Sequence, residues 1–172
     1  VDCTVEEAFE IESNYPFKGN IDPQKLEKTL QKSSKEKIPF VLLTITCNSA
    51  GGQPVSIENM RIVRALCDKY QIGFYIDGAR FAENAYFIKT REKEFVNHSI
   101  KQIVKEMFSL ADGMTMSAKK DGIVNMGGFI ALNDSELYKT CSNFAIMYEG
   151  FITYGGMSGR DMGALAQGLN EA

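Results

Sequence analysis

Histidine and cysteine are scarce in this sequence, and their placement excludes several kinds of catalytic site. The 172 residues include one histidine and four cysteines. His98 lies in the polar segment 96–99, a turn-like setting that disfavours a serine or cysteine triad built on it. No two cysteines have the C-x-x-C spacing, and a single histidine adds little to a metal site. We therefore expect free, mostly buried thiols in a reducing compartment at Cys3, Cys47, Cys67 and Cys141.

Long apolar runs and a strong net charge are also absent. The longest purely apolar stretch, Phe40–Leu43, is far shorter than the roughly 20 residues of a membrane span, and no signal segment opens the chain. The net charge is -3 and the isoelectric point is about 5.3, so no basic surface for nucleic acid is expected. We predict a cytoplasmic protein with no membrane and no nucleic-acid partner.

Glycine-rich phosphate loops are missing as well, because no G-x-G-x-x-G follows a strand and no P-loop is present. This disfavours a generic nucleotide-binding domain. The composition is 44% hydrophobic and 24% charged, which is typical of one globular domain with a buried core. The chain starts at Val1 rather than at methionine and stops just after an apolar-periodic helix. We expect it to be a piece of a longer protein.

Alternating strand and helix patterns indicate the fold class. Apolar or β-branched runs predict strands at 40–46, 73–77, 113–117 and 127–132. Helical periodicity, with capping residues before several segments, predicts helices after Asp22 and Ser56, at 79–89, from Ile100 to Phe108, and after a cap at Ser135. This order predicts an α/β fold, a mostly parallel sheet with helices on both faces and right-handed crossovers. The 40–46 run is apolar on both faces, which predicts a central strand covered on each side.

Polar residues follow three of these strands. In an open parallel sheet the carboxyl ends of the strands face the ligand crevice, and Asn48, Asp77 and Lys120 are expected there. Arg80 comes three residues after Asp77, and Ser117 three residues before Lys120. Each loop therefore presents two polar groups close together.

An ordered lysine and aspartate suit pyridoxal 5'-phosphate (PLP). A lysine forms a Schiff base with the cofactor aldehyde, and an aspartate against the ring nitrogen keeps the ring protonated. Each unit by which Asp77 raises the pKa of that nitrogen is worth about 1.4 kcal/mol, and a close opposite charge commonly gives about 1–3 units. Lys119 would lower the proton affinity of Lys120 by like-charge repulsion. The plainer alternatives are two solvated surface lysines and an aspartate that caps the next helix.

Three ungapped segments resemble the β-eliminating lyase family, which includes tryptophanase and tyrosine phenol-lyase. They are NSAGGQPVS at 48–56, DGARFAENAYFIK at 77–89 and MSAKKD at 116–121. The likeness extends from about Tyr15 to Gly156 and beyond. It implies the large domain of a fold-type I PLP enzyme. It also implies that the segment 1–172 is an internal part of that domain, without the amino-terminal segment and the carboxy-terminal small domain.

The resemblance also implies roles for individual residues. Lys120 would carry the cofactor, Asp77 would pair with the pyridine nitrogen, and Asn48 and Arg80 would lie near the 3-oxygen. Ser117 and Lys119 match phosphate-side positions, and Asn125 falls where the family uses a backbone carbonyl for an activating potassium ion. A homotetramer and an amino-acid substrate are implied too.

The mixture of motifs favours L-tryptophan as the substrate, with L-tyrosine as the alternative. An aminotransferase or an aldolase uses the same Asp and Lys, and an inactive fragment that serves as a subunit-interaction module is the non-enzymatic alternative. The residues that select the aromatic leaving group are expected outside this stretch.

Overall fold

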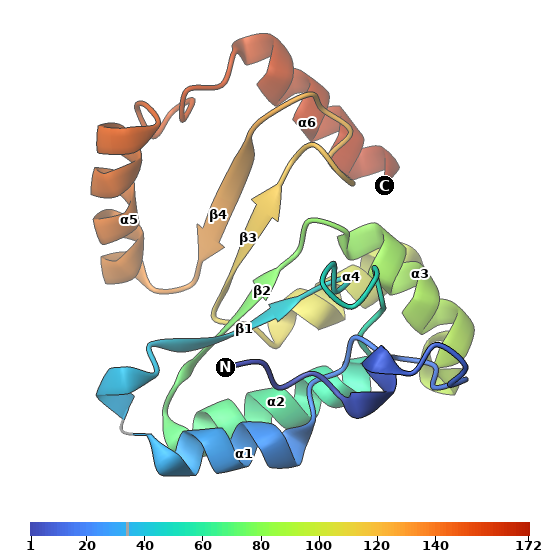
Figure 1. The fold of residues 1–172 in the computed structure, drawn as a ribbon. Helices are drawn as coiled ribbons and strands as arrows, with labels where there is room; N and C mark the ends of the chain where they lie inside the picture. The colour runs from blue at the N-terminus through green and yellow to red at the C-terminus, as the bar shows by residue number, and fades with distance from the viewer. Residues whose placement is uncertain (34) are drawn as a thin grey trace.

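A computed structural model describes residues 1–33 and 35–172. Its centre is a four-stranded sheet with the strand order β1-β2-β3-β4 (Figure 1). The strands are β1 (Phe40–Thr44), β2 (Gly73–Asp77), β3 (Gly113–Ser117) and β4 (Gly128–Leu132). The first three run parallel, and β4 pairs antiparallel with β3. The α/β architecture with a mostly parallel sheet is as the sequence predicts.

Four helices cover one face of the sheet, below it in Figure 1: α1 (Pro23–Lys32), α2 (Ile57–Tyr70), α3 (Phe81–Arg91) and α4 (Ile100–Ser109). Two more, α5 (Ser135–Tyr148) and α6 (Gly159–Glu171), lie on the other side, next to β3 and β4. Short 3-10 helices are found at Glu6–Phe9, Lys35–Lys37 and Lys93–Phe95. In the described ranges no helix is long and apolar enough to cross a membrane.

The hydrophobic core lies between the sheet and the first four helices. Alternate side chains of β1 and β2 point into it, and they meet fully buried residues of α2, α3 and α4. Its members include Leu43, Phe74, Ile76, Met60, Val63, Ile88, Ile103 and Met107, each at most 3% exposed. Burying each such side chain contributes about 1.5–3 kcal/mol relative to leaving it in water. This layer fixes the positions of the strand ends.

Side-chain caps start the helices where the sequence predicts them. Asp22 accepts hydrogen bonds from the first turn of α1, and Ser56 does so for α2. Such a cap is worth about 0.5–2 kcal/mol. The expectation for α5 was wrong in detail, because Asp134 is the cap and Ser135 is the first helical residue. The Asp134 carboxylate accepts from two amides, which one serine hydroxyl does less well.

Several element boundaries differ by one or two residues from the sequence expectation, among them those of α3 and β1. α3 begins at Phe81 rather than at Ala79, because the backbone before it is held in a loop. The Gly78 amide donates to the Thr115 carbonyl over 2.8 Å, and the Arg80 amide donates to the Ile45 carbonyl over 3.2 Å. β1 ends at Thr44 rather than at residue 46, since the chain leaves the sheet after Ile45.

The surroundings of β1 differ too. It was expected to be a central strand covered on both faces, but it lies at the edge of the described sheet. Phe40 and Leu42 are each 47% exposed, because the helices α1 to α4 lie on the opposite face. The prediction of mostly buried thiols was likewise wrong. The cysteines are free, but only Cys67 is buried, and burial raises the pKa of its thiol to about 11.

Candidate active site

The carboxyl ends of β1, β2 and β3 form one edge at which the predicted site residues gather. Thr44 lies opposite Asp77 in the β1–β2 register, and Asp77 lies opposite Thr115 in the β2–β3 register. The loops that follow these strands therefore start side by side. The parallel ladder thus brings residues that are far apart in the sequence to the same edge of the sheet.

The loop after β2 carries Asp77 and Arg80. The Asp77 side chain is half-buried, and its Oδ1 accepts from the Ala79 amide over 3.3 Å. The Arg80 Nη2 donates to Asn48 Oδ1 over 3.1 Å, which joins the β1 and β2 loops. Gly78 has no room for a side chain, since a Cβ there would lie 2.8 Å from the Phe108 ring. Phe108 of α4 therefore packs directly against the backbone next to Asp77.

The turn after β3 carries Lys119 and Lys120. Lys119 is exposed, whereas Lys120 is partly buried. The turn is braced on one side by the Ala118 amide, which donates to the Gly127 carbonyl over 2.9 Å. It is closed by the Ile123 amide, which donates to the Lys120 carbonyl over 3.0 Å. The two lysines therefore sit on a defined turn with different exposures.

Asp121 joins this turn to the loop after β2. Its amide donates to the Ala79 carbonyl over 3.2 Å. Its Oδ2 accepts from the Ala82 amide over 2.8 Å and from the Glu83 amide over 3.3 Å, at the start of α3. Sequence reasoning included Asp121 in a family motif but assigned it no role. A local pattern holds no signal for a carboxylate that caps a helix 39 residues away.

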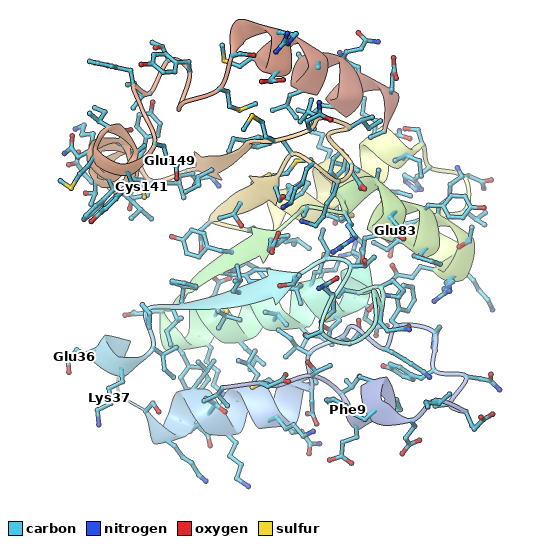
Figure 2. The ribbon with its side chains drawn as sticks, turned by 45° about the horizontal axis from the view of Figure 1, so that its top comes forward. Phe9, Glu36, Lys37, Glu83, Cys141 and Glu149 are labelled. Carbon is cyan, nitrogen blue, oxygen red and sulfur yellow. The ribbon has the colours of Figure 1, made fainter. Side chains whose placement is uncertain are left out.

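A cavity of about 770 Å³ opens beside these loops, within the usual size range of small-molecule sites. It lies between the second face of the sheet and the helices α5 and α6, and Figure 2 shows Cys141 and Glu149 on its α5 side. Asp77 and Ser117 line it together with Thr115 and Gly128. The described lining does not include Lys120, whose turn follows directly after Ser117.

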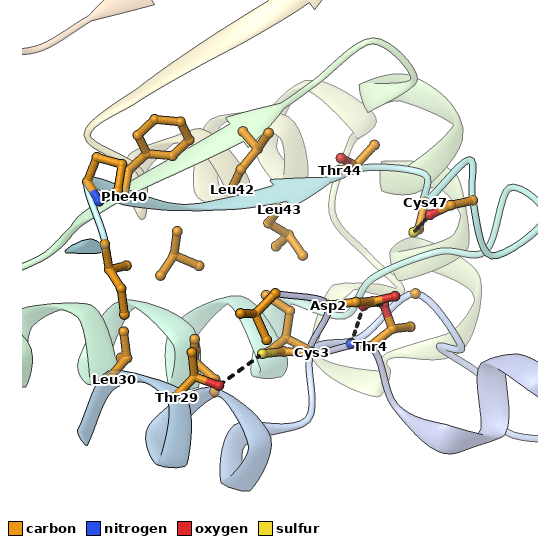
Figure 3. Close-up of a pocket in the computed structure, with 18 of the residues that line it drawn as sticks. Asp2, Cys3, Thr4, Thr29, Leu30, Phe40, Leu42, Leu43, Thr44 and Cys47 are labelled. Carbon is orange, nitrogen blue, oxygen red and sulfur yellow. Dashed lines mark hydrogen bonds between the residues drawn. The ribbon is translucent and has the colours of Figure 1, made fainter. Parts of the chain in front are cut away.

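A second cavity, of about 440 Å³, lies along the outer edge of β1. Figure 3 shows Phe40 and Leu42 on one side of the strand and Leu43 on the other, with Cys3 against Thr29 below. Its lining combines aliphatic side chains of β1 and α1 with polar residues of the amino-terminal segment and of the β1 ends. It includes none of the site residues that the sequence predicts, whereas Asp77 and Ser117 line the first cavity.

The donor set at the carboxyl edge fits the chemistry of PLP. Lys120 would supply an amine for the aldehyde, and Asp77 a carboxylate for the ring nitrogen. Asn48 and Arg80 would supply an amide–guanidinium pair for the 3-oxygen. Ser117 adds a hydroxyl on the cavity wall. Asn125 is exposed in the loop before β4. Within the described ranges no group of three or more His, Cys, Asp or Glu side chains is arranged for a metal ion.

Comparisons with known proteins identify the family of this chain. The family model described as beta-eliminating lyase matches residues 1–170. A tyrosine phenol-lyase from Clostridium tetani is 53% identical over 100% of this chain, and a tryptophanase from Salinibacter ruber is 50% identical over 99%. The chain spans only 37% and 36% of these relatives.

Solved structures show the same fold. A crystal structure described as an L-allo-threonine aldolase from Listeria monocytogenes EGD-E has a TM-score of 0.62 and 21% identity. The match covers 88% of this chain and 36% of that one. The fold class expected from the sequence, that of the fold-type I large domain, is therefore confirmed. With a family model that covers nearly the whole sequence, the chain belongs to the beta-eliminating lyase family.

Proposed function

We propose that this chain is the cofactor-carrying part of a PLP-dependent lyase that performs β-elimination on an aromatic amino acid. L-tryptophan would give indole, pyruvate and ammonium, and L-tyrosine would give phenol in place of indole. The observation that carries the proposal is the hydrogen-bonded junction of the Asp77 loop with the Lys120 turn at the carboxyl edge.

PLP, when bound, supplies an electron sink for the bond broken at the substrate α-carbon. The Asp77 carboxylate holds a proton on the ring nitrogen, which is the charge state that this sink requires. Lys120 would hold the cofactor, and its amine, when not bound to the cofactor, would move the proton at the substrate α-carbon. Arg80 and Asn48 orient the 3-oxygen, while Ser117 and Lys119 bind the phosphate. The two residues thus have distinct roles: Asp77 keeps a proton on the ring nitrogen, and Lys120 moves the proton at the α-carbon.

The aromatic group is left open by the relatives, whose names include both tyrosine phenol-lyase and tryptophanase at about 50% identity. The sequence motifs favour tryptophan, and the relatives make tyrosine an equal candidate. An assay that offers both amino acids to one preparation decides between them. Release of indole or of phenol identifies the substrate directly.

We further propose that the segment 1–172 acts within a longer polypeptide that assembles as a homotetramer in the cytoplasm. The chain covers little more than a third of its relatives. Large apolar side chains on and after α5 are exposed, with Phe144 at 55%, Tyr148 at 73% and Phe151 at 62%. Patches of this kind mark surfaces that another layer of protein covers.

The four free cysteines suit a reducing compartment. Potassium binding at the Asn125 carbonyl also belongs to this proposal.

Replacement of Lys120 tests the function. In the complete protein, Lys120→Ala should abolish turnover of both amino acids and the visible absorbance of lysine-bound cofactor. Lys105→Ala is the matched control, because Lys105 is exposed on α4, away from the site. Retained turnover in Lys120→Ala would contradict the assignment.

The same assay separates the alternatives. Transfer of the amino group without pyruvate release would indicate an aminotransferase, and cleavage of a β-hydroxy amino acid would indicate an aldolase. A complete protein that takes up no cofactor would indicate an interaction module instead.

A further inference from the structure

We propose that Asp121 is a positioning residue that locks the Lys120 turn onto the start of α3. The inference rests on the proposed function, since it concerns how the Lys120 amine is placed against the Asp77 loop. Asp121 does not line the cavity and would act through its neighbours rather than on substrate.

The geometry shows a clamp with contacts from both the backbone and the side chain. The Asp121 amide donates to the Ala79 carbonyl over 3.2 Å, and the carboxylate accepts from the Ala82 and Glu83 amides over 2.8 and 3.3 Å. α3 has no side-chain cap of its own, because its N-cap residue is Arg80 and makes no capping hydrogen bond. Asp121 therefore supplies the cap from another loop.

This arrangement couples the two halves of the site. Lys120 directly precedes Asp121 in the sequence. Arg80 and Phe81 directly precede Ala82, the first residue whose amide Asp121 caps. α6 supports the turn from the other side, since Gly168 packs against the Gly122 backbone so closely that a Cβ there would lie 2.1 Å from the Gly122 carbonyl oxygen. Loss of the carboxylate would free the turn to move relative to Arg80. A displacement of about 1 Å at a reacting group can cost about 100-fold in rate.

The test compares two matched caps in the complete protein. Asp22 caps α1 with contacts of 2.8 and 3.1 Å, similar to those of Asp121, but its carboxylate accepts from the helix that follows it and does not join two loops of the site. Asp121→Ala should lower kcat by about 10- to 100-fold with little change in KM. Asp22→Ala should lower the melting temperature comparably and leave kcat unchanged. Equal kcat in the two variants would overturn the proposal.

Two further variants keep the test decisive if Asp121→Ala does not fold. Asp121→Asn keeps an acceptor oxygen at the same reach, so kcat should stay within about 3-fold of the wild type, well short of the positional loss. Asp121→Glu keeps the charge but moves the turn by one methylene, so its kcat should fall. If kcat were instead kept in Asp121→Glu and lost in Asp121→Asn, the charge of residue 121 rather than its position would matter. That result would also overturn the proposal.

A cofactor-free measurement separates this inference from the proposed function. Amide hydrogen exchange at Ala82 and Glu83 should quicken in the apo form of Asp121→Ala and stay unchanged in Asp22→Ala. If the wild type binds PLP and turns over but Asp121→Ala behaves like Asp22→Ala, only the positioning role fails. If the wild type neither binds PLP nor turns over, the proposed function fails, and the positioning role fails with it.

Discussion

Asn84 offers a sharp test of how the core holds the loop before α2. The side chain is fully buried on α3. Its Oδ1 accepts from the Val55 amide over 2.9 Å, and its Nδ2 donates to the Val55 carbonyl over 3.0 Å. It pairs with Val55 as a neighbouring strand would. Val55 is itself 0% exposed, so solvent cannot readily replace the lost partner.

The expected cost of Asn84→Ala follows from these two bonds. Each buried backbone group left without a partner costs about 1–3 kcal/mol, and the better helix propensity of alanine returns at most about 0.7 kcal/mol. The net loss is about 2–5 kcal/mol, against a total of about 5–15 kcal/mol for a typical domain. At about 2–4 °C per kcal/mol, the melting temperature should fall by about 5–20 °C.

Circular dichroism melting and amide exchange at Val55 measure the effect. Exchange at Val55 should quicken by at least about 10-fold, since about 1.4 kcal/mol corresponds to a factor of ten. Asn143→Ala is the matched control, because Asn143 is an exposed asparagine in the helix α5, and this change should be neutral or slightly stabilising. A loss below about 1 kcal/mol in Asn84→Ala would refute the reasoning.

Two other substitutions have definite expected outcomes. Gly168→Ala should destabilise the packing of α6 on the Lys120 turn, whereas Gly163→Ala in the same helix meets open space and should stabilise by up to about 1 kcal/mol; equal melting temperatures would contradict this. Burial raises the pKa of Glu92, although the Ile57 and Glu58 amides that it accepts from act in the opposite direction. Its folded pKa lies above the unfolded one, so the stability of the wild type relative to Glu92→Gln should be greatest below about pH 4.3 and decline as the pH rises through the folded pKa. A difference that is constant with pH in urea titrations would show that Glu92 is not shifted.

Much of the fold and the placement of the main site loops could be predicted from the sequence. Apolar runs marked the strands, and Asp77 and Ser117 end strands as expected. The contacts that organise the site could not be predicted, because they join residues far apart in the chain. Asp121 reaches across 39 residues to Ala82, and Asn84 reaches across 29 to Val55. Nothing in a local pattern distinguishes these polar residues from solvated ones.

The surroundings of β1 were predicted wrongly for a related reason. The apolar side chains of Phe40 and Leu42 favour burial, which is what the pattern predicts. The pattern holds no information on which part of the protein covers these side chains. In the described residues that cover is lacking on one face. A pattern can therefore predict that a face is apolar without predicting its partner.

The antiparallel direction of β4 makes the site loops differ in how they tolerate changes of length. Because β4 runs back along β3, the stretch between Ser117 and Gly128 begins and ends at the same pair of strands. An inserted residue beyond the Lys120 turn would bulge outward and leave the parallel core untouched. One residue inserted between Asp77 and Phe81 would instead displace the start of α3, and a rotation of the helix by one residue, about 100°, would move part of its buried face into solvent. Natural variation in loop length should accordingly be tolerated better after Ile123 in the β3–β4 connection than between Asp77 and Phe81.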